Sequence, residues 1–266
     1  MLSRKSKLPL LIRLVFVLLT ILMTMPVSCG SRDAVTRNPL PGNDETGSVK
    51  LEILLKVMPF LTDDGKVSPV GSMSTETMGQ IKEILEQRLY CAGYRGFDVK
   101  EERDVKLLVT IPFVAVPGKD EKDRLERMLT KRGLLEFKEQ KQNGASKQAE
   151  WSTVMDGSQI DRSSVKLSTN KDIAAQEISF SFNEKGAKQF AELTARNTGR
   201  SIGIFLDGQL LVSPKVMEAI GDGKVMITGA SYQMETDYQD WANYLKHPDL
   251  PMILRVEKTE VKGPRR

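Results

Sequence analysis

Histidine and cysteine are nearly absent from this chain, whose 266 residues include one histidine and two cysteines. Metal sites and nucleophilic catalytic sites are usually built from several such residues at defined spacings. No such set can be assembled around His247, which we expect to cap the end of a helix in solvent. The sequence therefore predicts no catalytic residue, no metal and no cofactor, and we expect that the protein is not an enzyme.

A surplus of positive charge is missing from most of the chain. The formal net charge is +4, but residues 1–29 contain Arg4, Lys5, Lys7 and Arg13 and no acid. Beyond residue 29, basic and acidic residues are equal in number. Because nucleic-acid binding requires a face with surplus positive charge, we expect no nucleic acid among the partners.

The N-terminus has the features of a targeting segment. After the basic residues, Leu14–Met23 is apolar over a length that suits a signal peptide and is short for a membrane span. Cys29 follows in Pro26-Val27-Ser28-Cys29, which resembles a bacterial lipoprotein processing site. We therefore predict a signal peptide over residues 1–29, with lipid attached to Cys29. The alternatives are an uncleaved N-terminal membrane helix, and a chance cysteine beside an ordinary cleavage site.

The second cysteine, Cys91, lies within a helical pattern. If Cys29 carries lipid, Cys91 has no partner in the chain and is expected to be a small buried apolar residue. A disulfide between Cys29 and Cys91 is the alternative, because an exported chain meets oxidising conditions. Two cysteines do not decide between these possibilities.

Composition and periodicity divide the rest of the chain into segments. Residues 30–48 contain proline and glycine without an apolar period, which is typical of a flexible tether. The polar run Lys138–Ala149 predicts a junction, and we expect a hinge near Lys141–Ala149. The predicted order is a base subdomain over 49–140, a junction over 141–155, a head subdomain over 156–235, and a return to the base with a tail over 236–266.

Alternating and helical apolar patterns predict an α+β fold. The base pattern is β-α-β-β-α-β, the order of a ferredoxin-like sheet with helices on one face, and the head is an inserted or appended α+β unit. The expected base strands cover 50–58, 97–100, 106–111 and 134–137, and the expected helices cover 76–92 and 120–131.

The head pattern is the clearest in the chain. Ile178, Phe180 and Phe182 alternate with serines, which predicts a half-buried strand, and Asn183 offers a cap for the helix that follows. Asp207-Gly208 between two apolar runs predicts a hairpin whose second strand is Leu210–Val212. A final helix near 236–245 and a strand near 252–256 are also expected.

Three runs in the same order resemble the first periplasmic domain of the SecD protein-export family. Their letters are ILEQRLYCAGY at 84–94, LLVTIPFVAVPGKDEKDRLERMLTKRGLLEFKE at 107–139, and FSFNEKGAKQFAELTARNTGRSIGIFLDGQLLVSP at 180–214, continuing to KVMITG at 224–229. The family's Leu-Asp-Leu-Gln-Gly-Gly phrase is not found after Val49, and the sequence ends at Arg266, before the family's remaining membrane helices. We therefore expect no proton-driven motor in this chain.

The resemblance implies an extracytoplasmic module of the bacterial cell envelope that binds unfolded or emerging polypeptide during translocation, with export-machinery membrane subunits as further partners. We expect Leu210, Leu211 and Val212 to receive the polypeptide, or the strand containing Ile178, Phe180 and Phe182 to act as an edge for strand addition. The alternative function is a scaffold lipoprotein that binds one folded envelope partner.

Overall fold

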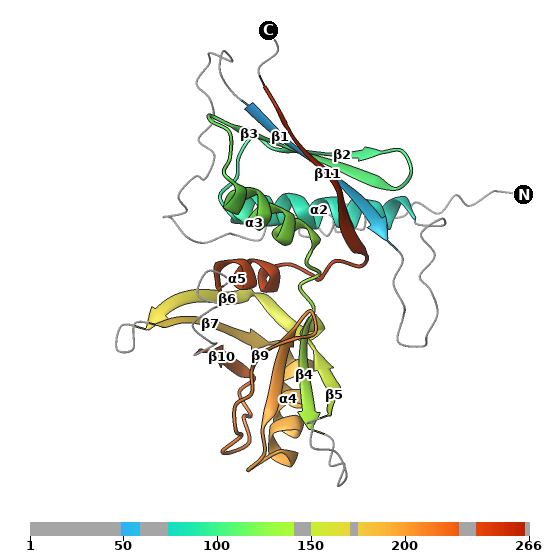
Figure 1. The fold of residues 1–266 in the computed structure, drawn as a ribbon. Helices are drawn as coiled ribbons and strands as arrows, with labels where there is room; N and C mark the ends of the chain where they lie inside the picture. Colours follow the sequence, from blue (N-terminus) through green and yellow to red (C-terminus); the bar gives the residue numbers. More distant parts are fainter. Residues whose placement is uncertain (1–48, 59–73, 141–149, 171–174, 229–237, 264–266) are drawn as a thin grey trace, which may run out of the picture. The chain divides into compact units, whose positions relative to one another are not determined.

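The computed structural model describes residues 49–58, 74–140, 150–170, 175–228 and 238–263. The predicted signal peptide, Cys29 and the tether lie outside these residues, as does 141–149 of the predicted junction. The described residues form a mixed α+β fold with antiparallel sheets, as predicted (Figure 1).

The base sheet has the strand order β11-β1-β3-β2. Its helices, α2 and α3, cover one face (Figure 1). In β1, Leu51, Ile53 and Leu55 are fully buried, because strict alternation directs every second side chain toward the helices. The bounds are β1 Val49–Met58, β2 Asp98–Glu102, β3 Lys106–Phe113, β11 Ile253–Lys262, α2 Thr75–Cys91 and α3 Lys119–Thr130.

The predicted fourth strand of the base, at 134–137, is a strand but belongs to another sheet. It forms β4 (Leu135–Gln140), which pairs with β5 and β8, and the fourth position of the base sheet is taken by β11. β11 pairs with β1 from Met58↔Ile253 to Lys50↔Lys262. Because β11 pairs along the whole length of β1, and β3 pairs with its other side, no edge of β1 is free for β4.

The head contains two further sheets and α4 (Glu184–Arg196). One sheet has the order β5-β4-β8-β9 and the other β10-β7-β6. The remaining bounds are β5 Trp151–Asp156, β6 Ile160–Asn170, β7 Ala175–Phe182, β8 Ile202–Leu206, β9 Gln209–Val212 and β10 Lys224–Ile227. Asn183 caps α4 as predicted, since its side chain accepts a hydrogen bond from the Gly186 N–H at 2.9 Å.

Two sequence predictions about the head are wrong. β7, with Ile178, Phe180 and Phe182, is not an edge strand, because β6 and β10 pair with its two sides. All three side chains are buried. The last part of the predicted junction is strand β5, which pairs with β4. Segment 141–149 thus connects two neighbours of one sheet and not the base with the head.

The chain passes between base and head at two other places. One crossing, 131–134, leads from α3 to β4, and the other, 247–252, leads from α5 (Tyr238–Lys246) to β11. The crossings are hydrogen-bonded to each other: the Leu250 N–H donates to the Arg132 carbonyl at 2.9 Å, and Arg132 Nε donates to the Leu250 carbonyl at 3.2 Å. The hinge expected near 141–149 is therefore in the wrong place.

The end of α5 differs from the solvent-facing turn that was predicted. His247 is buried, with 1% of its surface exposed. The bonds between Leu250 and Arg132 hold the segment after α5 against the first crossing, and the charges of Arg88 and Arg162, far away in sequence, act on the imidazole. The prediction of a solvent-exposed helix cap is therefore wrong.

Candidate functional site

An apolar groove opens on the head between α4, strands β4 and β8, and the segment 214–220 that follows β9. Its volume is about 320 Å³, at the lower end of the range of small ligand sites. Its lining residues come from four parts of the chain and are mostly apolar: Phe137, Phe190, Thr194, Ile202, Ile204, Pro214, Lys215, Val216, Met217, Glu218 and Ile220.

Backbone hydrogen bonds hold the outer wall of the groove in place at both ends. The Val216 N–H donates to the Arg200 carbonyl at 2.8 Å, and the Gly199 N–H donates to the Val216 carbonyl at 2.8 Å. At the far end, the Ile220 N–H donates to Thr194 Oγ1 at 2.9 Å. Gly199 adopts a left-handed φ of 82° shortly after the end of α4, a conformation that glycine takes without strain. The segment is therefore anchored on both sides of Met217.

The rim of the groove combines an adaptable apolar side chain with charges of both signs. Met217 is 78% exposed, which is unusual for so apolar a residue, and exposed Lys215 and Glu218 flank it. Methionine is unbranched and polarizable, so it can pack against differently shaped partners. Sequence reasoning missed this segment, because residues 214–220 carry no helical or strand period of apolar residues.

The aromatic side chains of β7 lie behind the groove and not at its surface. The Phe182 ring is 5.6 Å from that of Phe137 and 5.2 Å from that of Phe190, measured between ring centroids. Phe180 packs edge-on against Phe182 at 5.7 Å. Because Phe137 and Phe190 line the groove, the predicted strand residues form the rigid core that supports it.

The three hairpin residues predicted to bind polypeptide have different surroundings. Leu211 is buried and belongs to the core, so a polar substitution there would test folding and not binding. Leu210 is 42% exposed but is opposite Phe205. Val212 is half-buried and opposite Ile204, so it shares a sheet face with a residue of the groove wall.

β9 itself forms an edge of its sheet. It pairs with β8 on one side, and no strand of the described residues pairs with the other side. Its hairpin turn has the predicted geometry, with positive φ at both Asp207 (50°) and Gly208 (78°). The edge property that we expected of β7 thus belongs to β9, beside the groove.

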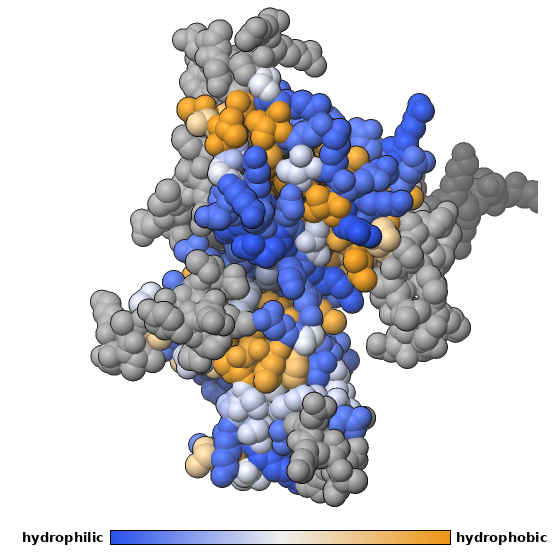
Figure 2. Space-filling view, in the orientation of Figure 1, coloured by the Kyte–Doolittle hydropathy of each residue, from blue (hydrophilic) through white to orange (hydrophobic). Residues whose placement is uncertain are grey.

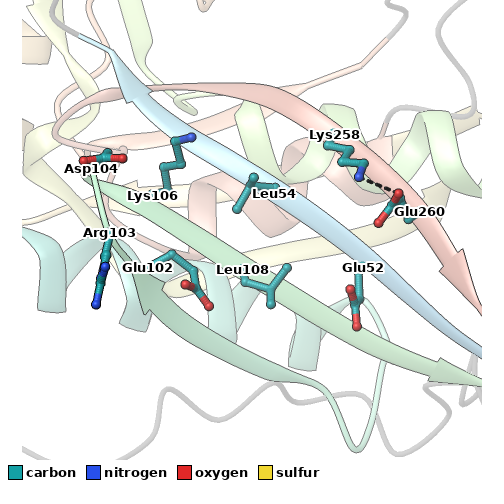
Figure 3. Close-up of a pocket in the computed structure, with 9 residues that line it drawn as sticks. All are labelled: Glu52, Leu54, Glu102, Arg103, Asp104, Lys106, Leu108, Lys258 and Glu260. Atoms are coloured by element: carbon teal, nitrogen blue, oxygen red, sulfur yellow. Dashed lines mark ion pairs between the residues drawn. The ribbon is translucent and has the colours of Figure 1, made fainter.

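The open face of the base sheet offers a different kind of surface. Figure 3 shows Leu54 and Leu108 between charged side chains of β1, β3 and β11. Lys258 and Glu260 form an ion pair at 2.6 Å, and the other charged residues are Glu52, Glu102, Arg103, Asp104 and Lys106. Figure 2 likewise shows hydrophilic residues dominating the visible face, with separate apolar patches. This charged surface is less suited than the head groove to an apolar ligand.

Groups typical of catalysis or metal binding are not gathered anywhere in the described part of the chain. Within those residues, no three His, Cys, Asp or Glu side chains are placed to hold a metal ion. No described helix is long and apolar enough to cross a membrane. Cys91 is the last residue of α2, and Cys29 lies outside the described residues. Lipid attachment to Cys29 therefore stays a prediction.

Two comparisons of the sequence with known proteins agree on one family. Residues 133–252 match the family model of the SecDF P1 head subdomain. The chain is 31% identical over 197 residues to protein translocase subunit SecD of Acidaminococcus fermentans, covering 74% of this chain and 43% of that protein. It is 28% identical over 226 residues to SecD of Sebaldella termitidis, covering 85% of this chain and 50% of that protein. The chain thus spans half or less of the length of these relatives.

Solved structures show the same fold. SecDF in its super-membrane-facing form superimposes with a TM-score of 0.64 at 20% identity, covering 81% of this chain and 30% of that one. A second structure, described as a membrane component SecDF that enhances protein export, has a TM-score of 0.58 at 18% identity. It covers 79% of this chain and 99% of that chain.

Fold and groove together define a two-part α+β domain: a base sheet covered by helices, and a head that carries an apolar surface site. With the sequence matches, the chain has the first periplasmic domain of the SecD family, as the sequence resemblance predicted.

Proposed function

We propose that this chain assists protein translocation across the membrane by binding unfolded or emerging polypeptide in the head groove, outside the cytoplasm. The observation that carries the proposal is the apolar groove with exposed Met217 on its rim, beside the edge strand β9. The matched relatives are named subunits of a protein translocase. The alternative of a scaffold for one folded partner has no comparable observation in its support.

An unfolded polypeptide presents the two kinds of group that this surface can receive. Its apolar side chains fit the groove wall at Ile204 and Met217. Its unpaired backbone N–H and C=O groups fit the free edge of β9, where strand addition gives affinity that does not depend on sequence. Val212 connects the two features, because it lies on β9 and shares a face with Ile204. A site of this kind would accept many clients.

The expected affinity is low, which suits a client that must move on. Burying roughly 200 Å² of apolar surface from one large side chain contributes about 5 kcal/mol. Ordering the peptide offsets part of this gain, so the dissociation constant of a single contact would be about 1 mM or weaker. Tethering at the membrane would raise the effective concentration of the head near emerging chains. We propose that lipid on Cys29 supplies that tether, and that export-machinery membrane subunits are further partners.

Site-specific photo-crosslinking tests the groove. A photoreactive residue replaces Met217 in the full chain, and the matched control replaces Met226, which is 61% exposed on β10, the edge strand of the other head sheet. During export we expect many different secreted chains to crosslink at position 217, with several-fold higher yield than at 226. Equal yields at the two positions would remove the groove from the function. A single folded partner recovered from both would support the scaffold alternative.

A further inference from the structure

The two crossings between base and head enclose a cluster of buried polar groups. Arg88 of α2 is fully buried, and its guanidinium donates only to backbone carbonyls: those of Met128 (3.2 Å), Lys131 (2.5 Å) and Arg132 (2.7 Å). Arg88 Nε, Asn243 Oδ1 and both ring nitrogens of His247 have no hydrogen-bond partner among the described residues. Buried polar atoms without partners are rare in folded proteins, and four lie on three residues around this junction.

The three charged groups that act on His247 are all positive and come from three different elements. Arg88 approaches from α2, Arg162 from β6, and Lys246 from α5 itself. Arg162 is also held by carbonyls, those of Leu245 (3.0 Å) and Gly157 (3.1 Å). The nearby carboxylates favour the charged form of the arginines. Asp207 and Asp249 act in this way on Arg88, while Asp249 and Asp156 act on Arg162. The Tyr244 ring covers the Arg88 guanidinium at 4.9 Å.

We propose that His247 makes the junction between base and head sensitive to pH, because a proton on its buried imidazole would add a further positive charge beside Arg88 and Arg162. The contact is then most stable at neutral pH, and the open state becomes more populated in mildly acidic medium. An opened junction would expose the imidazole to water, where the charged form is solvated. This inference concerns the coupling of the two parts and does not depend on what the head binds.

The sign of the effect follows from the surroundings of the imidazole. Burial, with the charges of Arg88, Lys246 and Arg162, lowers the pKa of His247 to about 3. The pKa of an exposed histidine is about 6.5. The closed junction is thus fully favoured above pH ~6.5 and loses stability as the pH falls from there toward 3. Between pH 7.5 and 5.5 the population of the open state should rise about tenfold.

Hydrogen exchange on the full chain tests the proposal. The Leu250 N–H, bonded to the Arg132 carbonyl, reports on the junction, and the Val109 N–H in β3 serves as a control inside the base. After correction for the intrinsic effect of pH, we expect protection of Leu250 to fall about tenfold from pH 7.5 to 5.5 while protection of Val109 stays constant. In His247→Gln and His247→Leu this fall should disappear. The same fall in both variants, or no fall in the native chain, would overturn the proposal.

A second measurement needs no variant. Because His247 is the only histidine, its imidazole C–H resonance can be identified without ambiguity in the native chain. We expect this resonance to keep the position of neutral imidazole well below pH 6.5, because the closed form remains the major one while protection falls, and to shift only at the pH where the open form becomes dominant. A resonance that titrates near pH 6.5 with Leu250 still protected would contradict the proposal even if both variants failed to fold.

Discussion

At the scale of single residues, Arg88 links α2 and α3 of the base to the first crossing and to α5. Its guanidinium donates hydrogen bonds to three backbone carbonyls at the end of α3 and in the first crossing. The backbone carbonyl of Arg88 accepts a hydrogen bond from Asn243 Nδ2 at 2.9 Å. Burial is the main cause that lowers the pKa of Arg88 to about 10, so the side chain remains charged at neutral pH. A charged group thus takes the place that a helix cap would occupy in a simpler connection.

We predict that Arg88→Ala lowers the free energy of unfolding by about 3 kcal/mol, because three carbonyls lose their donor and a cavity forms. Arg88→Met should cost less, about 1–2 kcal/mol, since the apolar stem is kept and no charge is buried. Urea denaturation of the full chain measures both. Arg127→Ala, at an exposed position of α3, is the control and should change stability by less than about 0.5 kcal/mol. Equal midpoints for Arg88→Ala and the control would contradict the role of Arg88.

The position of His247 shows what residue types alone leave open. The sequence predicted a helix cap in solvent, and His247 does follow the last residue of α5, Lys246. The imidazole is nevertheless buried, because residues far away in sequence, Arg88 and Arg162, pack around it. Leu211 and Leu210 are a similar case: the turn between two apolar runs predicted the strand, but only the pairing with β8 determines which side chain is covered.

At the scale of elements, the β8–β9 turn has a second task besides reversing the chain. The Asp207 carboxylate accepts hydrogen bonds from the Leu134 N–H at 2.9 Å and the Gly133 N–H at 3.2 Å. The Asp207 N–H donates to the Leu134 carbonyl at 2.9 Å. The turn is therefore attached to the first crossing, and the edge strand of the groove is positioned relative to the base by the same residue that closes the hairpin.

We predict that Asp207→Ala destabilises the chain by about 2–3 kcal/mol, because two backbone donors lose their acceptor and alanine is strained at a φ of 50°. Asp207→Asn should cost only about 1 kcal/mol, since asparagine tolerates the left-handed region and keeps one acceptor. Thermal denaturation of the full chain and of the two variants measures the order of their stabilities. The comparison is Asp222→Ala at an exposed turn, where one solvent-exposed backbone donor, the Lys224 N–H, loses its acceptor, and the expected cost is smaller, about 0.5–1 kcal/mol. An asparagine variant as unstable as the alanine variant would refute this account of the turn.

Local patterns predicted most elements but not their partners. The apolar periods marked β1, α2, α3, α4 and the β8–β9 hairpin, because each pattern is set by neighbouring residues. β4 and β11 carry the same kind of alternation, so nothing local distinguishes which joins β1. The groove was harder to predict than the strand pairing. Its outer wall, around Met217, has no periodic apolar pattern, and hydrogen bonds to residues such as Arg200 and Thr194 hold it in place.

For the whole molecule, the proposed function depends on how the domain is held at the membrane. The SecD relatives are longer than this chain, which covers 43% of one and 50% of another. Within the described residues no helix could cross a membrane. A tether on the N-terminal side would keep the head groove near emerging chains without restricting which client it meets. Lipid on Cys29 and a disulfide between Cys29 and Cys91 exclude each other, because both use the same thiol.

The intact mass of the native protein, extracted from membranes, separates these possibilities. We expect a mass that begins at Cys29 and includes acyl groups, because a small-residue site after an apolar run of this length suits lipoprotein processing. Cys29→Ser should then retain residues 1–28 and carry no acyl mass, while Cys91→Ser, the matched control, should be processed normally. A mass that retains residues 1–28 in the native protein would instead make the apolar run a membrane anchor. A rise of about 2 Da on reduction would establish the disulfide, and the lipid would then be excluded, since a thiol in a thioether cannot also be oxidised to a disulfide.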